Sequence, residues 1–212
     1  MRISISSTSC QGKTTYIQDF LKTWTNYKTP DKTYRDLMLK ENLPHSKNGT
    51  EESQKIILDF LVKESVANSN ETNIIFDRCP LDNLAYTSWL YLNDRVSETF
   101  LDKTRLAVRE SLRNFDVIFF VPIVKGYEIP IVEDVLRETD PVYREEIDNL
   151  FKTFQKSYHQ GDGRIFPQND SPAMIEIFGN REQRIQMTKL YIDENGSPHG
   201  EDKSLLSEII IP

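Results

Sequence analysis

Short apolar runs alternate with longer stretches of helical periodicity along most of this chain. The runs that predict strands are residues 2–6, 73–77, 116–122 and 173–178. Between the first two runs, Ile17, Phe20 and Trp24 share one face of a helix predicted over residues 13–27. Such alternation is typical of βαβ units built around a parallel sheet. The pattern therefore predicts a three-layer α/β fold, and we expect a parallel sheet of about five strands.

Local signals mark the beginnings of several other helices. Asp140 and Pro141 suit the cap and first turn of one helix, and Asn180 with Gln183 forms a capping-box pattern for another. Further helices are predicted to begin near residues 50, 80 and 99. Residues 29–48 are polar, with a short helix expected around residues 37–39. The apolar end at residues 205–211 fits either an edge strand or a partner contact.

Length, charge and cysteine content narrow the class of protein. The chain has 212 residues, 38% of them apolar, which suits one domain over residues 1–212. Within it we expect a lid at about residues 125–160 and an extension at about 193–212. A net charge of −7 does not favour non-specific nucleic-acid binding, and two cysteines form neither a disulfide framework nor a zinc pattern. No apolar run approaches the ~20 residues of a membrane span, so we expect a cytoplasmic protein with no membrane association.

A phosphate-binding loop is the strongest motif in the sequence. It follows a predicted strand and opens a predicted helix, the context in which backbone N–H groups surround phosphate. Its candidate ATP-binding residues are Ser7, Thr8, Ser9, Cys10, Gln11, Gly12, Lys13, Thr14 and the adjoining Thr15. Lys13 is expected to reach the β- and γ-phosphates, and Thr14 to hold Mg²⁺. Ser7 departs from the motif, which has glycine at this position.

An Asp-Arg pair follows the second predicted strand. Asp77 ends this strand at the edge of the sheet where ligands bind in α/β folds, and Arg78 follows it. A carboxylate there can accept a proton from an acceptor hydroxyl or hold Mg²⁺, and an arginine can neutralise phosphate. The alternative is a surface ion pair, with Asp82 merely favouring the start of the next helix.

The segment from Phe76 to Tyr86 resembles two related groups of kinases. Asp77-Arg78 followed by Leu84-Ala85-Tyr86 is similar to a segment of the thymidylate kinases. The string from Phe76 to Asp82 resembles AAA-type P-loop kinases of bacteriophages and bacteria, related to nicotinamide riboside kinases. The resemblance implies a P-loop NTPase fold with a helical lid. It also implies that Asp77 serves the acceptor hydroxyl or the metal, and that Arg78 contacts phosphate.

Two later segments extend this resemblance. Residues 134–144 resemble the lid of these kinases, which makes Arg137 and Arg144 candidate catalytic residues that stabilise the transferring phosphate. The alternative is a charged, solvated loop and helix face. Residues 175–184 resemble the last strand and turn beside the adenine, where Arg184 is expected to stack on the base.

These features predict a Mg-ATP-dependent kinase acting on a nucleoside or a deoxynucleoside monophosphate. Nicotinamide riboside is a further small-molecule acceptor. One alternative is a phage DNA-modification kinase acting on 5-hydroxymethyluracil in DNA, located in the host cytoplasm. A basic groove for that polymer would draw on Lys28, Lys32, Arg35, Lys40 and Lys47. An alternative of another class is a nucleotide-dependent ATPase switch or binding module. Thymidylate-kinase relatives are often dimers, so a homodimer stays open.

Overall fold

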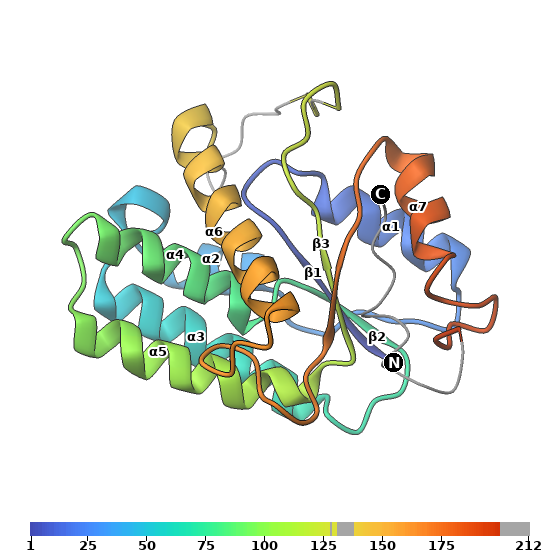
Figure 1. Ribbon diagram of the computed structural model, residues 1–212, viewed down its shortest axis with the longest axis horizontal. Helices are drawn as coiled ribbons and strands as arrows, with labels where there is room; N and C mark the ends of the chain where they lie inside the picture. Colours follow the sequence, from blue (N-terminus) through green and yellow to red (C-terminus); the bar gives the residue numbers. More distant parts are fainter. Residues whose placement is uncertain (128, 131–137, 200–212) are drawn as a thin grey trace.

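A parallel four-stranded sheet forms the centre of the computed structural model, which describes residues 1–127, 129–130 and 138–199. The strands are β1 (Arg2–Ser6), β2 (Ile74–Asp77), β3 (Val117–Phe120) and β4 (Ala173–Glu176). Their spatial order is β2-β1-β3-β4, so β1 lies between β2 and β3 (Figure 1). The carboxyl ends of β1 and β2 therefore meet at one edge, where ligands bind in folds of this type.

The expectation of about five strands is wrong for the described residues, because the sheet has four. The chain passes beside β2 at Lys28, whose backbone pairs on both sides with Asn73 and Ile75. In a strand, every second residue directs its backbone N–H and carbonyl towards the same neighbour. The next residue to pair with β2 after Lys28 would be Pro30, which has no N–H to donate. The pairing therefore stops at a single bridge and does not grow into a fifth strand.

Helices cover both faces of this sheet (Figure 1). On one face lie α1 (Lys13–Thr23) and α7 (Arg181–Thr188), which contact each other. The other face carries α3 (Glu51–Ala67), α4 (Pro80–Leu92), α5 (Glu98–Ser111) and α6 (Pro141–His159). The short helix α2 (Tyr34–Glu41) packs on α3, and single 3-10 turns occupy Ser46–Asn48 and Leu112–Asn114. The predicted three-layer α/β architecture is confirmed.

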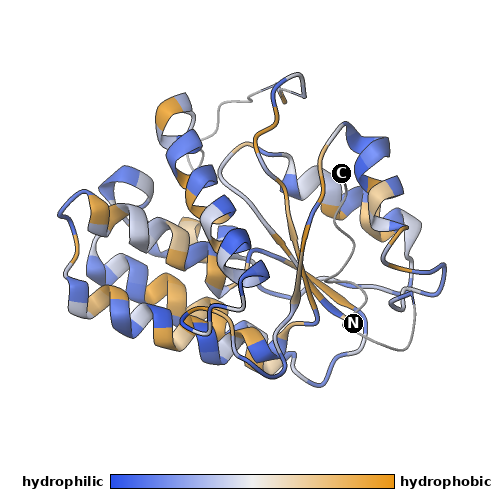
Figure 2. Cartoon of the chain, viewed as in Figure 1, coloured by the Kyte–Doolittle hydropathy of each residue, from blue (hydrophilic) through white to orange (hydrophobic). Residues whose placement is uncertain are grey.

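The sheet separates two apolar cores, seen as orange strands and inward helix faces in Figure 2. Ile3 and Ile5 of β1 point towards α1 and α7, where they pack with Phe20. The residue after Ile5, Ser6, points to the other side, where it contacts Asp82 of α4. This arrangement explains why polar and apolar residues alternate in β1. One side of this central strand packs in an apolar core, and the other side contacts a polar cluster that is described below.

Helix boundaries follow the predicted capping signals. Thr50, Asp140 and Asn180 are the N-caps of α3, α6 and α7, and each side chain accepts a hydrogen bond from the first turn of its helix. The helix predicted over residues 13–27 ends earlier, at Thr23. There Trp24 leaves the helix and donates from Nε1 to the carbonyl of Asp193 at 2.7 Å. This long-range bond is invisible to local periodicity.

Among the described residues, none of the helices is both long and apolar enough to span a bilayer.

Candidate active site

The phosphate loop connects β1 to α1 and is curled by left-handed residues. Cys10 has φ 58° and Gly12 has φ 72°, a conformation that glycine adopts without strain. A Cβ on Gly12 would also lie 3.2 Å from Ile129 Cδ1 and 3.4 Å from Arg184 Nη1. Ser7 has a backbone outside the left-handed region, so the first motif position does not require glycine in this loop.

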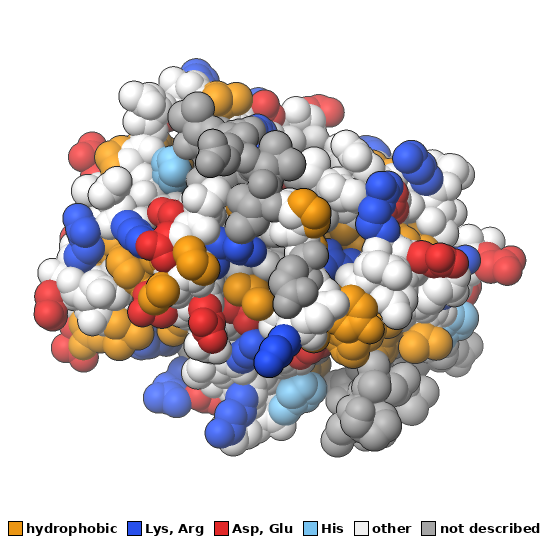
Figure 3. Space-filling model, turned by 90° about the horizontal axis from the view of Figure 1, so that it is seen from above, with side chains coloured by type: hydrophobic (Ala, Val, Ile, Leu, Met, Phe, Trp, Pro, Cys, Tyr) orange, Lys and Arg blue, Asp and Glu red, His pale blue; other side chains and the backbone are white. Residues whose placement is uncertain are grey.

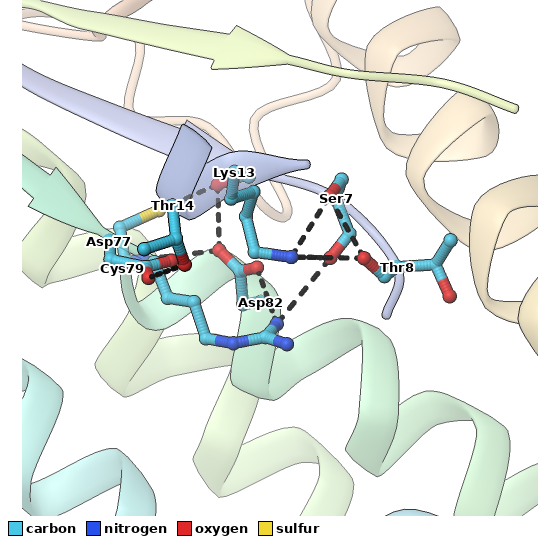
Figure 4. A network of polar contacts seen from close by, with 9 residues as sticks. Ser7, Thr8, Lys13, Thr14, Asp77, Cys79 and Asp82 are labelled. Atoms are coloured by element: carbon cyan, nitrogen blue, oxygen red, sulfur yellow. Dashed lines mark hydrogen bonds and ion pairs between the residues drawn. The ribbon is translucent and has the colours of Figure 1, made fainter. Parts of the chain in front are cut away.

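Lys13 folds back into its own loop. Its ammonium donates to the carbonyls of Ser7 at 3.2 Å and Thr8 at 2.9 Å, and to Ser7 Oγ at 2.9 Å (Figure 4). Burial, and after it the positive charge of Arg78, lower the pKa of Lys13 from 10.5 to about 7. The Ser7 hydroxyl, which replaces the expected glycine, thus supplies one of the three acceptors that hold the lysine.

Thr14 and Asp77 lie together at the carboxyl edge of the sheet. Thr14 Oγ1 donates to Asp77 Oδ2 at 3.5 Å, at the long end of the hydrogen-bond range (Figure 4). The other carboxylate oxygen, Asp77 Oδ1, is buried without a hydrogen-bond partner among the described residues, as is Thr8 Oγ1 in the loop. Leaving such oxygens unpaired in a buried place is costly, which makes both of them candidate ligand contacts.

Arg78 forms a buried ion pair with Asp82. Its Nη1 lies 2.9 Å from Asp82 Oδ1, and the two side chains are 13% and 2% exposed. Asp82 Oδ2 accepts from Ser6 Oγ at 2.6 Å and from the backbone N–H of Cys79 at 3.1 Å. Burial raises the pKa of the Asp82 carboxyl, and the nearby guanidinium opposes that rise. Arg78 also donates weakly to the Ser7 carbonyl at 3.4 Å, which joins this pair to the phosphate loop.

The role of Asp82 is larger than the sequence predicts. Its interpretation as a helix-start residue is correct, since it accepts from Cys79 N in the first turn of α4. The sequence interpretation misses that Asp82 also neutralises Arg78 and accepts a hydrogen bond from Ser6 on β1. The spacing of four residues between Arg78 and Asp82 is the one signal that allows their pairing to be inferred.

Two tyrosines flank Arg78. The centre of its guanidinium lies 5.1 Å from the Tyr34 ring and 5.4 Å from the Tyr86 ring, within the range of cation–π contact. Burial raises the pKa of Tyr34 to about 12. Tyr34 belongs to α2, so the segment 29–48, for which the sequence predicts only a short helix, contributes a wall of the site.

Two adjoining hollows open beside these residues. The first, which we name the α2 cleft, encloses about 620 Å³ of space, part of it open to solvent. Its lining includes Thr14, Lys32, Glu64, Asp77 and Arg78. The second, which we name the inner pocket, encloses about 250 Å³. Its lining residues are Tyr34, Gln54, Ile57, Leu61, Arg78, Asp82, Asn83 and Tyr86.

A third hollow, which we name the α7 cleft, lies on the opposite side of the phosphate loop. It encloses about 620 Å³ and includes Gly12, Thr15 and Arg184 in its lining. Arg184 donates from Nη1 to the carbonyl of Gln11 at 2.7 Å and from Nε to the carbonyl of Gly179 at 2.9 Å. It lies where the sequence predicts a base-binding residue, but it ties the loop to the turn after β4.

The structure describes only one of the two arginines predicted for the lid. Arg144, in the first turn of α6, donates from Nε to the carbonyl of Ser9 at 3.0 Å and is 8% exposed. It therefore lies beside the phosphate loop, and its contact with a transferring phosphate stays a prediction. Arg137 lies outside the described residues.

The fold and the loop define the class of protein: a P-loop NTPase fold of the kind found in nucleoside and nucleotide kinases. The chain belongs to the AAA domain family, whose sequence profile matches residues 2–160. No curated protein matches the sequence.

Solved structures resemble this fold at low sequence identity. A NadR protein in complex with NR has a TM-score of 0.64 at 11% identity over 95% of this chain, which spans about half (53%) of that one. Deoxyadenosine kinase from M. mycoides, with dCMP and dCDP bound, gives 0.55 at 20% identity over 90% of this chain and 98% of that one. Thymidylate kinase from Candida albicans gives 0.51 at 16% identity over 89% of each chain.

Proposed function

We propose that this protein is an ATP-dependent kinase that phosphorylates a nucleoside or a deoxynucleoside monophosphate. The observation that carries the proposal is the placement of Thr14 and Asp77, 3.5 Å apart, in the lining of the α2 cleft. A phosphate loop and a carboxylate with an unpartnered oxygen thus face one cleft. A nucleotide-dependent switch needs the loop but not a second cleft beside it.

The donor side supports the binding of ATP. The N-terminus of α1 and the ammonium of Lys13 favour negative charge, and Lys13 exchanges its loop acceptors for phosphate oxygens when nucleotide binds. The α7 cleft is a suitable site for the adenine, because it adjoins the loop at Gly12 and Thr15. Arg184 borders this cleft and donates a hydrogen bond to the Gln11 carbonyl. It therefore positions the phosphate loop whether or not it stacks on the base.

A magnesium ion fits the residues at the Thr14–Asp77 contact. A hydroxyl and a carboxylate are the hard oxygen ligands that Mg²⁺ prefers, and Asp77 Oδ1 has no hydrogen-bond partner among the described residues. When bound with ATP, the ion supplies neutralisation of phosphate charge. Among the described residues there is no cluster of three or more acidic, histidine or cysteine side chains, which agrees with a metal shared with the nucleotide.

Acceptor activation is assigned to Asp77. An acceptor hydroxyl in the α2 cleft passes its proton to the Asp77 carboxylate as its oxygen bonds to the γ-phosphorus. Arg78 and Arg144 approach the loop at the Ser7 and Ser9 carbonyls, from where they offset charge on the transferring group. Most of the rate enhancement in this arrangement comes from positioning and charge.

Modified DNA is the less favoured acceptor. Of the side chains expected to form a basic groove, Lys28 pairs with Glu71 at 3.0 Å, Lys40 with Glu41 at 3.0 Å, and Lys47 with Asp140. Figure 3 shows basic and acidic side chains interspersed on the face seen from above, among the residues that it colours by type. Interspersed charge does not make the continuous positive surface that a polyanion needs.

The test is phosphoryl transfer from γ-labelled ATP in the presence of Mg²⁺. The acceptors are nucleosides, deoxynucleoside monophosphates, nicotinamide riboside, and duplex DNA with and without 5-hydroxymethyluracil. We expect label on a free nucleoside or nucleotide. If label is found only on modified DNA, the acceptor is DNA and not a small molecule. If label is released only as phosphate with every acceptor, the ATPase switch is favoured.

A further inference from the structure

A buried carboxylate on α6 takes no part in the site described above. The side chain of Asp148 is 0% exposed, and its Oδ1 accepts a hydrogen bond from the backbone N–H of Ile123 at 2.9 Å. Lys152, one turn later on α6, places its ammonium 2.8 Å from Asp148 Oδ2 and 3.5 Å from the Ile123 carbonyl. Burial raises the pKa of the Asp148 carboxyl, and the Lys152 ammonium opposes that rise. A carboxylate buried to this degree is costly unless it is paired and hydrogen-bonded, so these partners define its position closely.

Ile123 lies where the pairing of β3 with β1 stops. Val121 still donates to the Ser6 carbonyl at 3.0 Å, but the next residue, Pro122, has no N–H to continue the ladder. The chain leaves the sheet here, and the Asp148 carboxylate receives the N–H of Ile123. Asp148 therefore joins α6 to the carboxyl edge of the sheet directly after β3.

The same face of α6 also meets the phosphate loop. Arg144 precedes Asp148 by four residues, so the two side chains lie on one face of the helix. Arg144 Nε donates to the carbonyl of Ser9 at 3.0 Å, in the loop after β1. Two successive turns of α6 are thus bound to the segments that follow two neighbouring strands, at Ser9 and at Ile123.

The other contacts between α6 and the sheet constrain Arg144 less directly. Phe151 stacks on a ring of β3, with the centroids 5.4 Å apart, but burial of apolar surface is non-directional and tolerates a small rotation of the helix. Gln155 forms a side-chain hydrogen bond with Glu176 at the end of β4. That contact lies about three turns from Arg144, whereas Asp148 lies about one turn away. A change at Asp148 should therefore displace the Arg144 guanidinium more than a change at Gln155.

We propose that Asp148 is a positioning residue, which fixes the rotation of α6 against the end of β3 and so holds the Arg144 guanidinium beside the phosphate loop. The inference rests on the proposed function, in which Arg144 offsets charge on the transferring group. Asp148 acts on the reaction only through Arg144. Its contribution to the rate is set by how precisely the guanidinium must be placed, and a displacement of about 1 Å can cost about a hundredfold.

The first experiment is a double-variant cycle in the labelled-ATP assay, with the acceptor that the panel identifies. Asp148→Ala should lower kcat by about tenfold to a hundredfold and leave the KM for ATP within about threefold, because a contact made in the transition state is misplaced. Arg144→Ala should lower kcat by at least as much. In the Arg144→Ala background, adding Asp148→Ala should cost less than about threefold. Losses that multiply would overturn the inference, because Asp148 would then not act through Arg144.

The same measurements separate this inference from the proposed function. Full activity of Arg144→Ala would remove the role that the proposed function gives to Arg144, and this inference with it. A large loss in Arg144→Ala with full activity in Asp148→Ala would overturn only the inference. No transfer to any acceptor by the unaltered protein would overturn the proposed function itself.

Two further variants distinguish positioning from a loss of stability. Asp148→Asn keeps an oxygen that can accept from the N–H of Ile123, so kcat should fall less than in Asp148→Ala; if Asp148→Ala does not fold, the cycle is run with Asp148→Asn. The matched control is Gln155→Ala, which removes the more distant contact of α6 and should leave kcat within about threefold. Urea unfolding measures the stability of each variant. An equal fall of kcat in Gln155→Ala and Asp148→Ala, or a kcat that follows stability alone, would assign Asp148 a purely structural role.

Discussion

The donor side and the acceptor side of this site are built in different ways. On the donor side, Lys13 contacts Ser7 and Thr8, and all the partners lie within one loop. On the acceptor side, Arg78 meets Tyr34 from α2, Asp82 and Tyr86 from α4, and the Ser7 carbonyl. Lys13 is therefore held within its own loop, whereas the surroundings of Arg78 exist only after the chain has folded.

The strongest test of the donor side is removal of the Lys13 ammonium. Lys13→Ala should reduce turnover by about a thousandfold or more, because a positioned cation at the transferring phosphate is lost. Steady-state phosphotransfer measures this effect. Lys22→Ala, an exposed lysine on the same helix, is the matched control. Near wild-type activity in Lys13→Ala would show that the loop does not serve phosphate in the proposed way.

The corresponding test of the acceptor side is Asp77→Asn. This change keeps the size of the side chain and removes the base, so kcat should fall by about 100-fold to 1,000-fold. ATP binding, measured by titration calorimetry, should weaken much less. The exposed Asp102 on α5 provides the control variant, Asp102→Asn. An equal loss of ATP affinity and of kcat would place Asp77 on the donor side and weaken the contrast between the two regions.

The buried ion pair predicts a cost in stability. Asp82→Asn leaves Arg78 without its partner charge, so the free energy of unfolding should fall by about 3–5 kcal/mol. Urea unfolding measures this difference. Replacing both residues, as in Arg78→Met with Asp82→Leu, should restore most of the stability while activity stays low. Additive losses in a cycle of the two single variants and this double variant would show that the pair is not coupled.

The lowered pKa of Lys13 predicts a proton uptake on ATP binding. Between pH 7 and 10.5 the folded chain holds fewer protons than the unfolded chain, so this group makes stability rise with pH across that window. Below pH 7 the cost of burying the ammonium is present in full. Phosphate favours the charged lysine, so binding at about pH 8.5 should take up a proton and binding at about pH 6 should not.

Calorimetry in two buffers of different ionisation enthalpy separates these cases. Identical heats in both buffers at the higher pH would show that the lysine is already charged before the nucleotide arrives. In Lys13→Met the dependence on buffer should disappear, whatever nucleotide affinity that variant retains.

The smallest expected effect concerns Ser7, whose hydroxyl accepts from Lys13 at 2.9 Å and donates to the Thr8 carbonyl at 2.9 Å. Removing it frees one acceptor that competes with phosphate, so Ser7→Ala should tighten ATP binding by about threefold to tenfold. Ser69→Ala, in the turn after α3, serves as the control. Weaker binding in Ser7→Ala would instead mean that the hydroxyl contacts the nucleotide.

The contrast also explains what the sequence could and could not predict. The phosphate loop, the Asp-Arg turn and the caps at Thr50, Asp140 and Asn180 depend on neighbours in sequence, and all lie where local patterns predict them. The walls of the cleft depend on packing between distant elements. No local pattern reveals that Tyr34 lies over Arg78.

The predictions of the strand count and of the end of α1 were wrong for a related reason. The count of about five strands comes from what is usual for such sheets, whereas here pairing beside β2 is stopped by one proline, Pro30, two residues after the bridge at Lys28. At the early end of α1, Trp24 donates to the carbonyl of Asp193, which lies far along the chain. Contacts of this range leave no periodic signal.

The turn at Arg78 combines a strained backbone with a buried ion pair at a single position. Arg78 has φ 80°, a backbone conformation that side-chain-bearing residues adopt only with strain of about 1 kcal/mol or more. Glycine would relax this backbone, yet it would also remove the guanidinium that faces Asp82 and the two tyrosines. Glycine at Arg78 alone should therefore lower the stability of the protein, because the buried Asp82 carboxylate loses its partner charge at a cost that exceeds the strain relieved.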